Sequence, residues 1–128
     1  PQPVVHRAKA KAAHGAIYFG STSPAMAETR AMLDDRGLHL DTLRVRGYPF
    51  PESVKEFVLA HESVFVVEQN RDAQLRTLLI EQFDLDPARL VPILHYDGTP
   101  ITARFIFGEI GKRMGSANVL PLRDGKVA

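Results

Sequence analysis

Short apolar runs alternate with longer amphipathic segments along most of this chain. Four runs are rich in aliphatic, β-branched and aromatic residues, which is typical of buried strands. Between them, apolar residues recur at intervals of three and four, as they do on one face of a helix. The predicted strands are residues 16–19, 38–45, 64–67 and 90–95, and the predicted helices cover about 24–36, the segment opening at Pro51, 75–83 and 103–114.

Local signals mark where several of these elements begin and end. Ser23 is a favourable N-cap with Pro24 at the first helical position, and Gly37 supplies a left-handed stop for that helix. Residues 38–45 alternate between apolar and polar side chains, which predicts a half-buried strand. Pro92 places the last strand at or near a sheet edge. The remaining predicted caps are Asn70 or Asp72 for the third helix and Thr99-Pro100 for the last.

The strand–helix alternation predicts an α/β fold with a mostly parallel sheet and helices on both faces. Residues 15–114 would form one domain. Residues 1–14 read as a linker with room for an edge strand at Pro3-Val4-Val5, and residues 115–128 read as a weakly ordered tail. The opening Pro1-Gln2-Pro3 looks like the inside of a longer polypeptide, so we expect a domain fragment or a processed product.

The most informative stretch is the run from Val64 to Gln74. Four apolar residues, 64–67, are followed directly by a polar segment that precedes the third predicted helix. In open α/β sheets, ligands and partners bind at the carboxyl ends of the strands. Polar residues at the ends of the other strands would meet there too. The candidate interface or ligand edge therefore comprises Ser21, Thr22, Arg46, Glu68, Gln69, Asn70, Arg71, Gln74, His95, Tyr96, Asp97 and Gly98.

The amino-acid composition excludes several classes of function for this chain. The 128 residues are 45% hydrophobic and carry a net charge of +1, which suits one globular domain and gives no reason to expect a nucleic-acid partner. The chain has no cysteine, which excludes disulfides and cysteine-ligated zinc or iron–sulfur clusters within it. No apolar run reaches the length of a membrane span, so we expect a cytoplasmic protein without a membrane partner.

Common catalytic and cofactor motifs are incomplete. A dinucleotide site needs several glycines after the first strand and an acidic residue after the second, but the chain offers Gly20 alone and then Arg44-Val45-Arg46. It has no G-x-S-x-G elbow, and it lacks the acidic residues that a phosphorelay receiver needs after the first strand. Three alternatives stay open: an anion at residues 21–23, a metal on Glu68, His95 and Asp97, and a plain loop and helix cap at residues 68–71.

Four segments together resemble one family. They are Gly20-Ser21 after a strand, residues 48–51 (YPFP), residues 66–75 (VVEQNRDAQL) and residues 94–103 (LHYDGTPITA). Over about residues 15–111, the chain resembles the carboxyl-terminal domain of the alpha subunit of 2-oxoacid:ferredoxin oxidoreductases. It is most similar to the 2-oxoglutarate enzymes.

The resemblance implies a transketolase carboxyl-terminal fold, a three-layer α/β/α sandwich on a sheet of four to five strands. The strand order would be an antiparallel amino-terminal edge strand, then residues 38–45, 16–19, 64–67 and 90–95. The family oxidatively decarboxylates a 2-oxoacid to its acyl-CoA with thiamine diphosphate, Mg²⁺ and an iron–sulfur cluster, and it reduces ferredoxin. Those groups belong mainly to other domains and to the beta subunit.

The resemblance also implies that this chain is not catalytic on its own. The family's catalytic residues have no matching positions here, so we expect no catalytic residue, no cofactor bound by this chain alone and no turnover. The implied partners are the preceding domains of the alpha subunit, the beta subunit and, through the whole complex, ferredoxin. The alternatives are a small-ligand module that binds an anion or coenzyme A near Arg46, and an interaction protein of the same fold.

Overall fold

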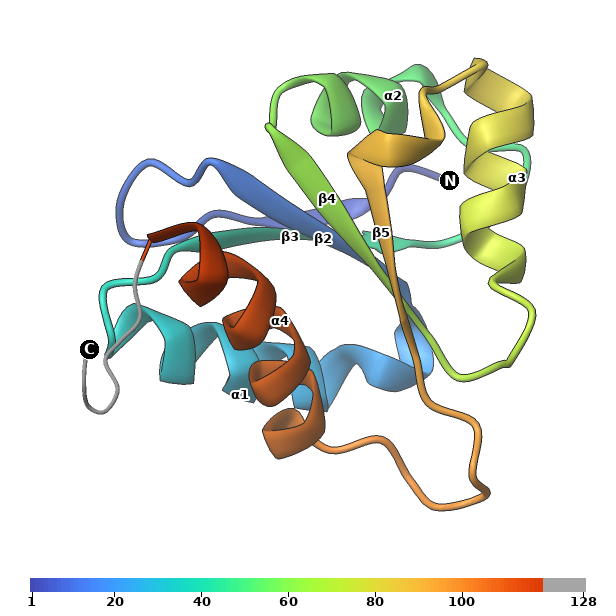
Figure 1. The fold of residues 1–128 in the computed structure, drawn as a ribbon. Coiled ribbons are helices and arrows are strands. Elements are labelled where there is room, and N and C mark those ends of the chain that lie inside the picture. The colour runs from blue at the N-terminus through green and yellow to red at the C-terminus, as the bar shows by residue number, and fades with distance from the viewer. Residues whose placement is uncertain (119–128) are drawn as a thin grey trace.

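The computed structural model describes residues 1–118 (Figure 1). No helix in this part of the chain is long and apolar enough to cross a membrane. Two 3₁₀ turns, Gly20–Thr22 and Pro87–Arg89, join longer elements. Those elements are β1 (Val4–His6), β2 (His14–Phe19), α1 (Ser23–Asp34), β3 (Leu40–Val45), α2 (Glu52–Leu59), β4 (Ser63–Glu68), α3 (Gln74–Phe83), β5 (Leu90–Leu94) and α4 (Ala103–Asn118).

The five strands form one mixed sheet in the order β1-β3-β2-β4-β5. Strands β2 to β5 are parallel, with β2 at the centre, and β1 pairs antiparallel with β3, placing Val5 opposite Leu43. This is the strand order that the family resemblance implies. The prediction that Pro92 lies on a sheet edge is also confirmed, because β5 is the outermost strand on its side.

Helices cover both faces of the sheet, which confirms the predicted α/β/α sandwich (Figure 1). Successive residues of β2 point to opposite faces, so Ile17 joins one core and its neighbours Ala16 and Tyr18 join the other. Helices α2 and α3 pack on the Ile17 side, and α1 and α4 pack on the Tyr18 side. The sheet is therefore an apolar layer with a separate hydrophobic cluster on each face.

Strand β3 differs from its prediction. Its alternating sequence predicts a half-buried strand, but every residue except Arg44 is buried. The polar members are buried because each has hydrogen-bonding partners. Thr42 accepts a hydrogen bond from the Arg30 guanidinium at 2.9 Å, and the Asp41 carboxylate accepts from three donors. Periodicity alone does not distinguish a solvent-facing polar residue from a partnered buried one.

Several helix ends also differ from their predicted positions. Helix α1 begins at Ser23, and the residue at its N-cap, Thr22, makes no side-chain cap bond. The stop at Gly37 is confirmed by its φ of +73°. Helix α4 begins after Thr102, whose hydroxyl accepts from the N–H of Phe105, so the predicted cap at Thr99-Pro100 is wrong. Helix α4 runs to Asn118, into the predicted tail, and residues 119–128 lie outside the described part of the chain.

Candidate functional site

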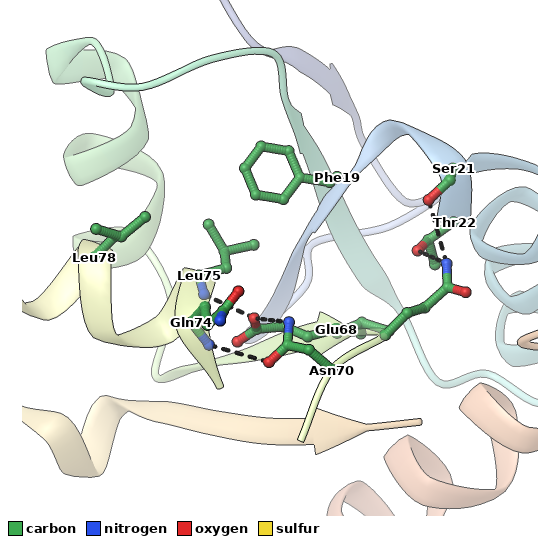
Figure 2. Close-up of a pocket in the computed structure, with 10 residues that line it drawn as sticks. Phe19, Ser21, Thr22, Glu68, Asn70, Gln74, Leu75 and Leu78 are labelled. Carbon is green, nitrogen blue, oxygen red and sulfur yellow. Dashed lines mark hydrogen bonds between the residues drawn. The ribbon is translucent and has the colours of Figure 1, made fainter. Parts of the chain in front are cut away.

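A pocket lies where the carboxyl ends of β2 and β4 meet the start of α3 (Figure 2). Its volume is about 260 Å³. The strands bring the polar residues that follow them to this edge, as parallel strands do in α/β folds. Six of the residues of the predicted interface or ligand edge, Ser21, Thr22, Glu68, Gln69, Asn70 and Gln74, line this pocket. The lining residues are Phe19, Ser21, Thr22, Val67, Glu68, Gln69, Asn70, Gln74, Leu75 and Leu78.

Glu68 is the only charged residue that lines the pocket, and the chain itself uses its charge. It is 4% exposed. Its Oε1 accepts from the Leu75 N–H at 2.7 Å and from the Asn70 amide at 2.9 Å, while Oε2 accepts from the Arg76 N–H at 3.0 Å. The carboxylate thus satisfies two free N–H groups at the start of α3, and it lies at the positive end of the helix dipole.

Glu68 shares with Asn70 the capping role that the sequence assigned to Asn70 or Asp72. The residue at the N-cap of α3 is Ala73, in the left-handed region with a φ of 51°, and it makes no side-chain cap bond. Asn70 supports the turn, because its Oδ1 accepts from the N–H groups of Asp72 and Gln74 at 3.1 and 3.3 Å. The Asp72 side chain instead lies 3.8 Å from the Arg71 guanidinium, in an exposed pair.

Gln69 joins the two halves of the pocket. Its side-chain amide donates to the hydroxyls of Ser21 and Thr22, at 3.3 and 3.1 Å (Figure 2). These bonds tie the loop after β4 to the turn after β2. In these contacts the hydroxyls of residues 21 and 22 accept, which leaves their O–H groups able to donate, so the contacts do not decide whether an anion binds there.

The apolar side of the pocket was not foreseen from the sequence. It consists of Phe19, Leu75 and Leu78, together with Val67 of β4. Phe19 ends β2 and remains 42% exposed, although its neighbour Tyr18 is 1% exposed. The sequence did contain an indication that Phe19 lies at this edge, because Phe19 is the last residue of a predicted buried strand and Gly20 follows it.

The remaining predicted edge residues lie outside the pocket lining. Arg46 and Arg71 are exposed. His95, Asp97 and Thr99 form a separate loop cluster, in which the His95 Nε2 lies 3.0 Å from the Thr99 carbonyl oxygen and 3.2 Å from Asp97 Oδ1. Gly98 turns this loop at a φ of +89°, and Tyr96 is 59% exposed on it. Hydrogen bonds from the hydroxyl and the N–H of Thr99 lower the pKa of Asp97.

The considered metal site on Glu68, His95 and Asp97 is not formed. Within residues 1–118, no three side chains of metal-ligating type converge. The oxygens of Glu68 point to α3, and the ring nitrogen Nε2 of His95 points into its own loop. The edge thus divides into a pocket whose one carboxylate is hydrogen-bonded within the chain, and a self-contained loop at residues 95–99.

Comparisons with known proteins identify solved structures of similar fold. No protein-family profile and no curated protein matches the chain. Among solved structures, a 2-oxoglutarate:ferredoxin oxidoreductase from Magnetococcus marinus with 2-oxoglutarate, coenzyme A and succinyl-CoA bound is similar, with a TM-score of 0.79 and 22% identity over 89% of this chain. A split-gene transketolase, an inactive beta4 tetramer, matches 85% of this chain with a TM-score of 0.64 and 17% identity.

A third similar structure is the alpha chain of a probable 2-oxoacid ferredoxin oxidoreductase from Thermoplasma acidophilum. It has a TM-score of 0.60 and 23% identity, and the match covers 89% of this chain and 97% of that one. Our chain spans only 20% of the Magnetococcus marinus chain and 40% of the transketolase chain.

The chain is therefore a mixed α/β/α domain with the transketolase carboxyl-terminal-like fold. Two of these three similar structures carry the name of the enzyme group that the sequence motifs resemble, 2-oxoacid:ferredoxin oxidoreductases. At 22%, 17% and 23% identity, these three similarities show the fold.

Proposed function

We propose that this chain is the carboxyl-terminal domain of the alpha subunit of a thiamine-diphosphate-dependent 2-oxoacid:ferredoxin oxidoreductase, with 2-oxoglutarate as the substrate. The fold similarity to two such enzymes and the motifs at residues 66–75 and 94–103 support this assignment. Within the enzyme, the domain serves assembly rather than chemistry. It packs on the preceding domains of the alpha subunit or on the beta subunit.

The pocket does not fit the diphosphate of the cofactor. Its lining carries one charge, the Glu68 carboxylate, which would repel a phosphate group. The two arginines of the predicted edge, Arg46 and Arg71, are not among the lining residues. We therefore assign thiamine diphosphate, Mg²⁺, the iron–sulfur cluster and coenzyme A to other parts of the complex, and no step of the reaction is assigned to this chain.

One observation carries the docking proposal: a half-exposed aromatic beside a partly apolar pocket. Phe19 and Leu78 offer apolar surface, and the single carboxylate of the pocket, that of Glu68, is already hydrogen-bonded by donors of its own chain. Gln74 is exposed at the rim. Such a surface matches an apolar side chain of another polypeptide, flanked by backbone groups that can bond the Gln74 amide. In the similar Magnetococcus marinus chain, four-fifths of the polypeptide lies outside the matched part, so a domain of this fold has further polypeptide to pack against there.

The docking test uses the chain coexpressed with the alpha-subunit domains and beta subunit of its complex. Phe19→Ser removes the exposed ring, and Leu59→Ser is the matched control, because Leu59 is 52% exposed at the other end of the sheet, where α2 leads into β4. We expect Phe19→Ser to weaken co-purification at least tenfold and Leu59→Ser to leave it unchanged. Equal co-purification of both variants would show that the pocket is not the docking site.

The family assignment has its own test, which is independent of the pocket. The assembled complex should reduce ferredoxin in the presence of 2-oxoglutarate and coenzyme A, and the isolated chain should not. A complex that assembles but does not turn over 2-oxoglutarate or another 2-oxoacid would refute the assignment, whatever the Phe19 variant does.

The alternative function, a free-standing module that binds coenzyme A or another anion, is less well supported. Its predicted anchor is the turn at residues 21–23, but Thr22 there is only 3% exposed and no Lys or Arg side chain lines the adjacent pocket. Calorimetric titration of the isolated chain with coenzyme A, and separately with thiamine diphosphate, distinguishes the two functions. Tight, stoichiometric binding would favour the module, and no heat of binding would favour the assembly domain.

A further inference from the structure

The opposite end of the sheet holds a buried polar cluster that the candidate site does not use. Its centre is Asp41, near the start of β3, and His61, just after α2. They are 7% and 4% exposed. Buried charged groups of this kind need partners, because an unpaired charge in the interior is strongly unfavourable.

The Asp41 carboxylate binds three segments of the chain at once. Its Oδ1 accepts from the Ala8 N–H at 2.8 Å. Its Oδ2 accepts from the Arg7 guanidinium at 3.2 Å and lies 2.9 Å from the His61 Nε2. The two donors from residues 7 and 8 belong to the amino-terminal segment, and the histidine belongs to the loop before β4.

His61 holds Asp41 in place from the other side. Its Nδ1 lies 2.7 Å from the Phe57 carbonyl oxygen. A carbonyl oxygen can only accept, so the contact at Nδ1 needs a hydrogen on that nitrogen, while Nε2 faces the Asp41 carboxylate. Both ring nitrogens are then bonded, which fixes the ring and orients the carboxylate toward residues 7 and 8.

Asp41 holds residues 1–8, the strap. It contains β1, which has only three residues and covers the outer edge of β3. Its apolar anchoring is weak, since Val4 is half-buried and Val5 is 38% exposed. Besides β1 pairing, the strap has a hydrogen bond between Gln2 and Ser53. The contacts with Asp41 are its only described bonds to a buried side chain.

The charged neighbours of the cluster come from every element around it. Arg7 lies on the strap, His14 begins β2, Glu62 precedes β4, and the Arg89 guanidinium donates to the His61 carbonyl oxygen. Burial raises the pKa of the Asp41 carboxyl. The hydrogen bonds from His61, Ala8 and Arg7 outweigh burial and hold this pKa below its ordinary value of 3.8.

We propose that Asp41 is an acid-sensitive latch: its ionised carboxylate holds the strap against β3, and its protonation releases the strap and uncovers the β3 edge. An uncovered edge strand offers free N–H and C=O groups to other chains. The proposal does not depend on the function of the carboxyl-edge pocket.

The experiment measures amide hydrogen exchange of residues 4–8 by NMR in the 128-residue chain, corrected for intrinsic exchange rates. We expect Asp41→Asn to speed exchange of the Ala8 amide roughly tenfold or more, because it removes charge-assisted hydrogen bonds. Asp34→Asn is the matched control. Asp34 also pairs with a histidine, His39 at 2.7 Å, but has no described contact with the strap.

Two further measurements test the latch even if the Asp41→Asn variant does not fold. Arg7→Ala leaves the Asp41–His61 contact in place and should speed strap exchange by a smaller factor, since the Arg7 side chain is 66% exposed. In the unmodified chain, strap exchange should rise as pH falls below 3.8 while exchange in β2 does not. Strap exchange that is unchanged in Arg7→Ala and unaffected by acid would overturn the latch.

Discussion

Asn70 donates its side-chain amide to the Glu68 carboxylate at 2.9 Å, so the last residue of β4 and a residue of the following loop together cap a helix that begins at Gln74. The carboxylate reaches forward along the chain to the N–H groups of Leu75 and Arg76. This arrangement explains how a nearly buried acid remains at the edge of the sheet with no ion-pair partner among residues 1–118.

Replacing Glu68 by glutamine should destabilise the fold. The glutamine oxygen can keep the acceptor position for Leu75, but its amide would face the Arg76 N–H, donor against donor. We expect the free energy of unfolding to fall by about 2 kcal/mol in urea denaturation. Glu81→Gln, at an exposed position of the same helix, should change it by less than about 0.5 kcal/mol. Equal effects of the two substitutions would contradict the capping role.

Gln82 should be important for holding the loop between β3 and α2. Its Oε1 accepts from the Phe50 N–H at 2.8 Å, and its Nε2 donates to the Phe50 carbonyl oxygen at 2.7 Å. Gln82→Ala leaves both backbone groups without this partner and should cost about 2 kcal/mol of unfolding free energy. Gln82→Glu should not restore it, because a second carboxylate oxygen would face the Phe50 carbonyl. Full stability of the glutamate variant would refute this account.

Two glycines should respond to alanine in opposite directions. A Cβ on Gly15 would lie 2.8 Å from the Phe57 ring, which is itself buried, so Gly15→Ala should destabilise by about 1–3 kcal/mol. A Cβ on Gly108, an exposed position in α4, would meet nothing within 4 Å, so Gly108→Ala should stabilise by up to about 1 kcal/mol. Thermal unfolding of both variants checks the pair, and a stabilised Gly15 variant would show that the ring has room to move.

His14 should make stability fall in mild acid. Burial lowers its pKa below the ordinary 6.5, the nearby His61 lowers it further, and Glu62 opposes the shift. The unfolded chain therefore binds a proton at higher pH than the folded one, so this contribution is complete above pH 6.5 and is lost as pH falls below it. The fall ends at the lower pKa of the folded state. Unfolding free energies of the unmodified chain and of His14→Gln, measured across this window, should diverge, and parallel curves would contradict the prediction.

The order of elements was predictable because strands and helices have different apolar spacings, and the long stripes of α3 and α4 were especially clear. The strand order needed the family resemblance, since nothing local places β2 between β3 and β4. The sequence indicated the sheet edge at which the pocket lies, but not the apolar side chains that line it. Its location follows from strand direction, whereas the exposure of Phe19 depends on how far α3 covers the end of β2.

The least predictable features join residues that are far apart in the chain. Asp41 appears in the sequence as one polar position in an alternating strand, and its burial depends on donors from the strap and from His61. Glu68 looked like a free acid at a binding edge because its partners are backbone N–H groups, which every residue but proline has. Sequence patterns show side-chain type, but these roles depend on three-dimensional partners.

The central position of β2 has a consequence for how the chain folds. Both neighbours of β2, β3 and β4, come later in the sequence, and each is separated from it by at least one helix. The middle of the sheet therefore cannot form from a local hairpin, and the first half of a growing polypeptide carries an apolar strand with one side unpaired. Because α1 packs in the same cluster as α4, synthesis must reach the last helix before that cluster closes. Such non-local contacts slow folding, so the nascent chain exposes this strand until β4 has emerged.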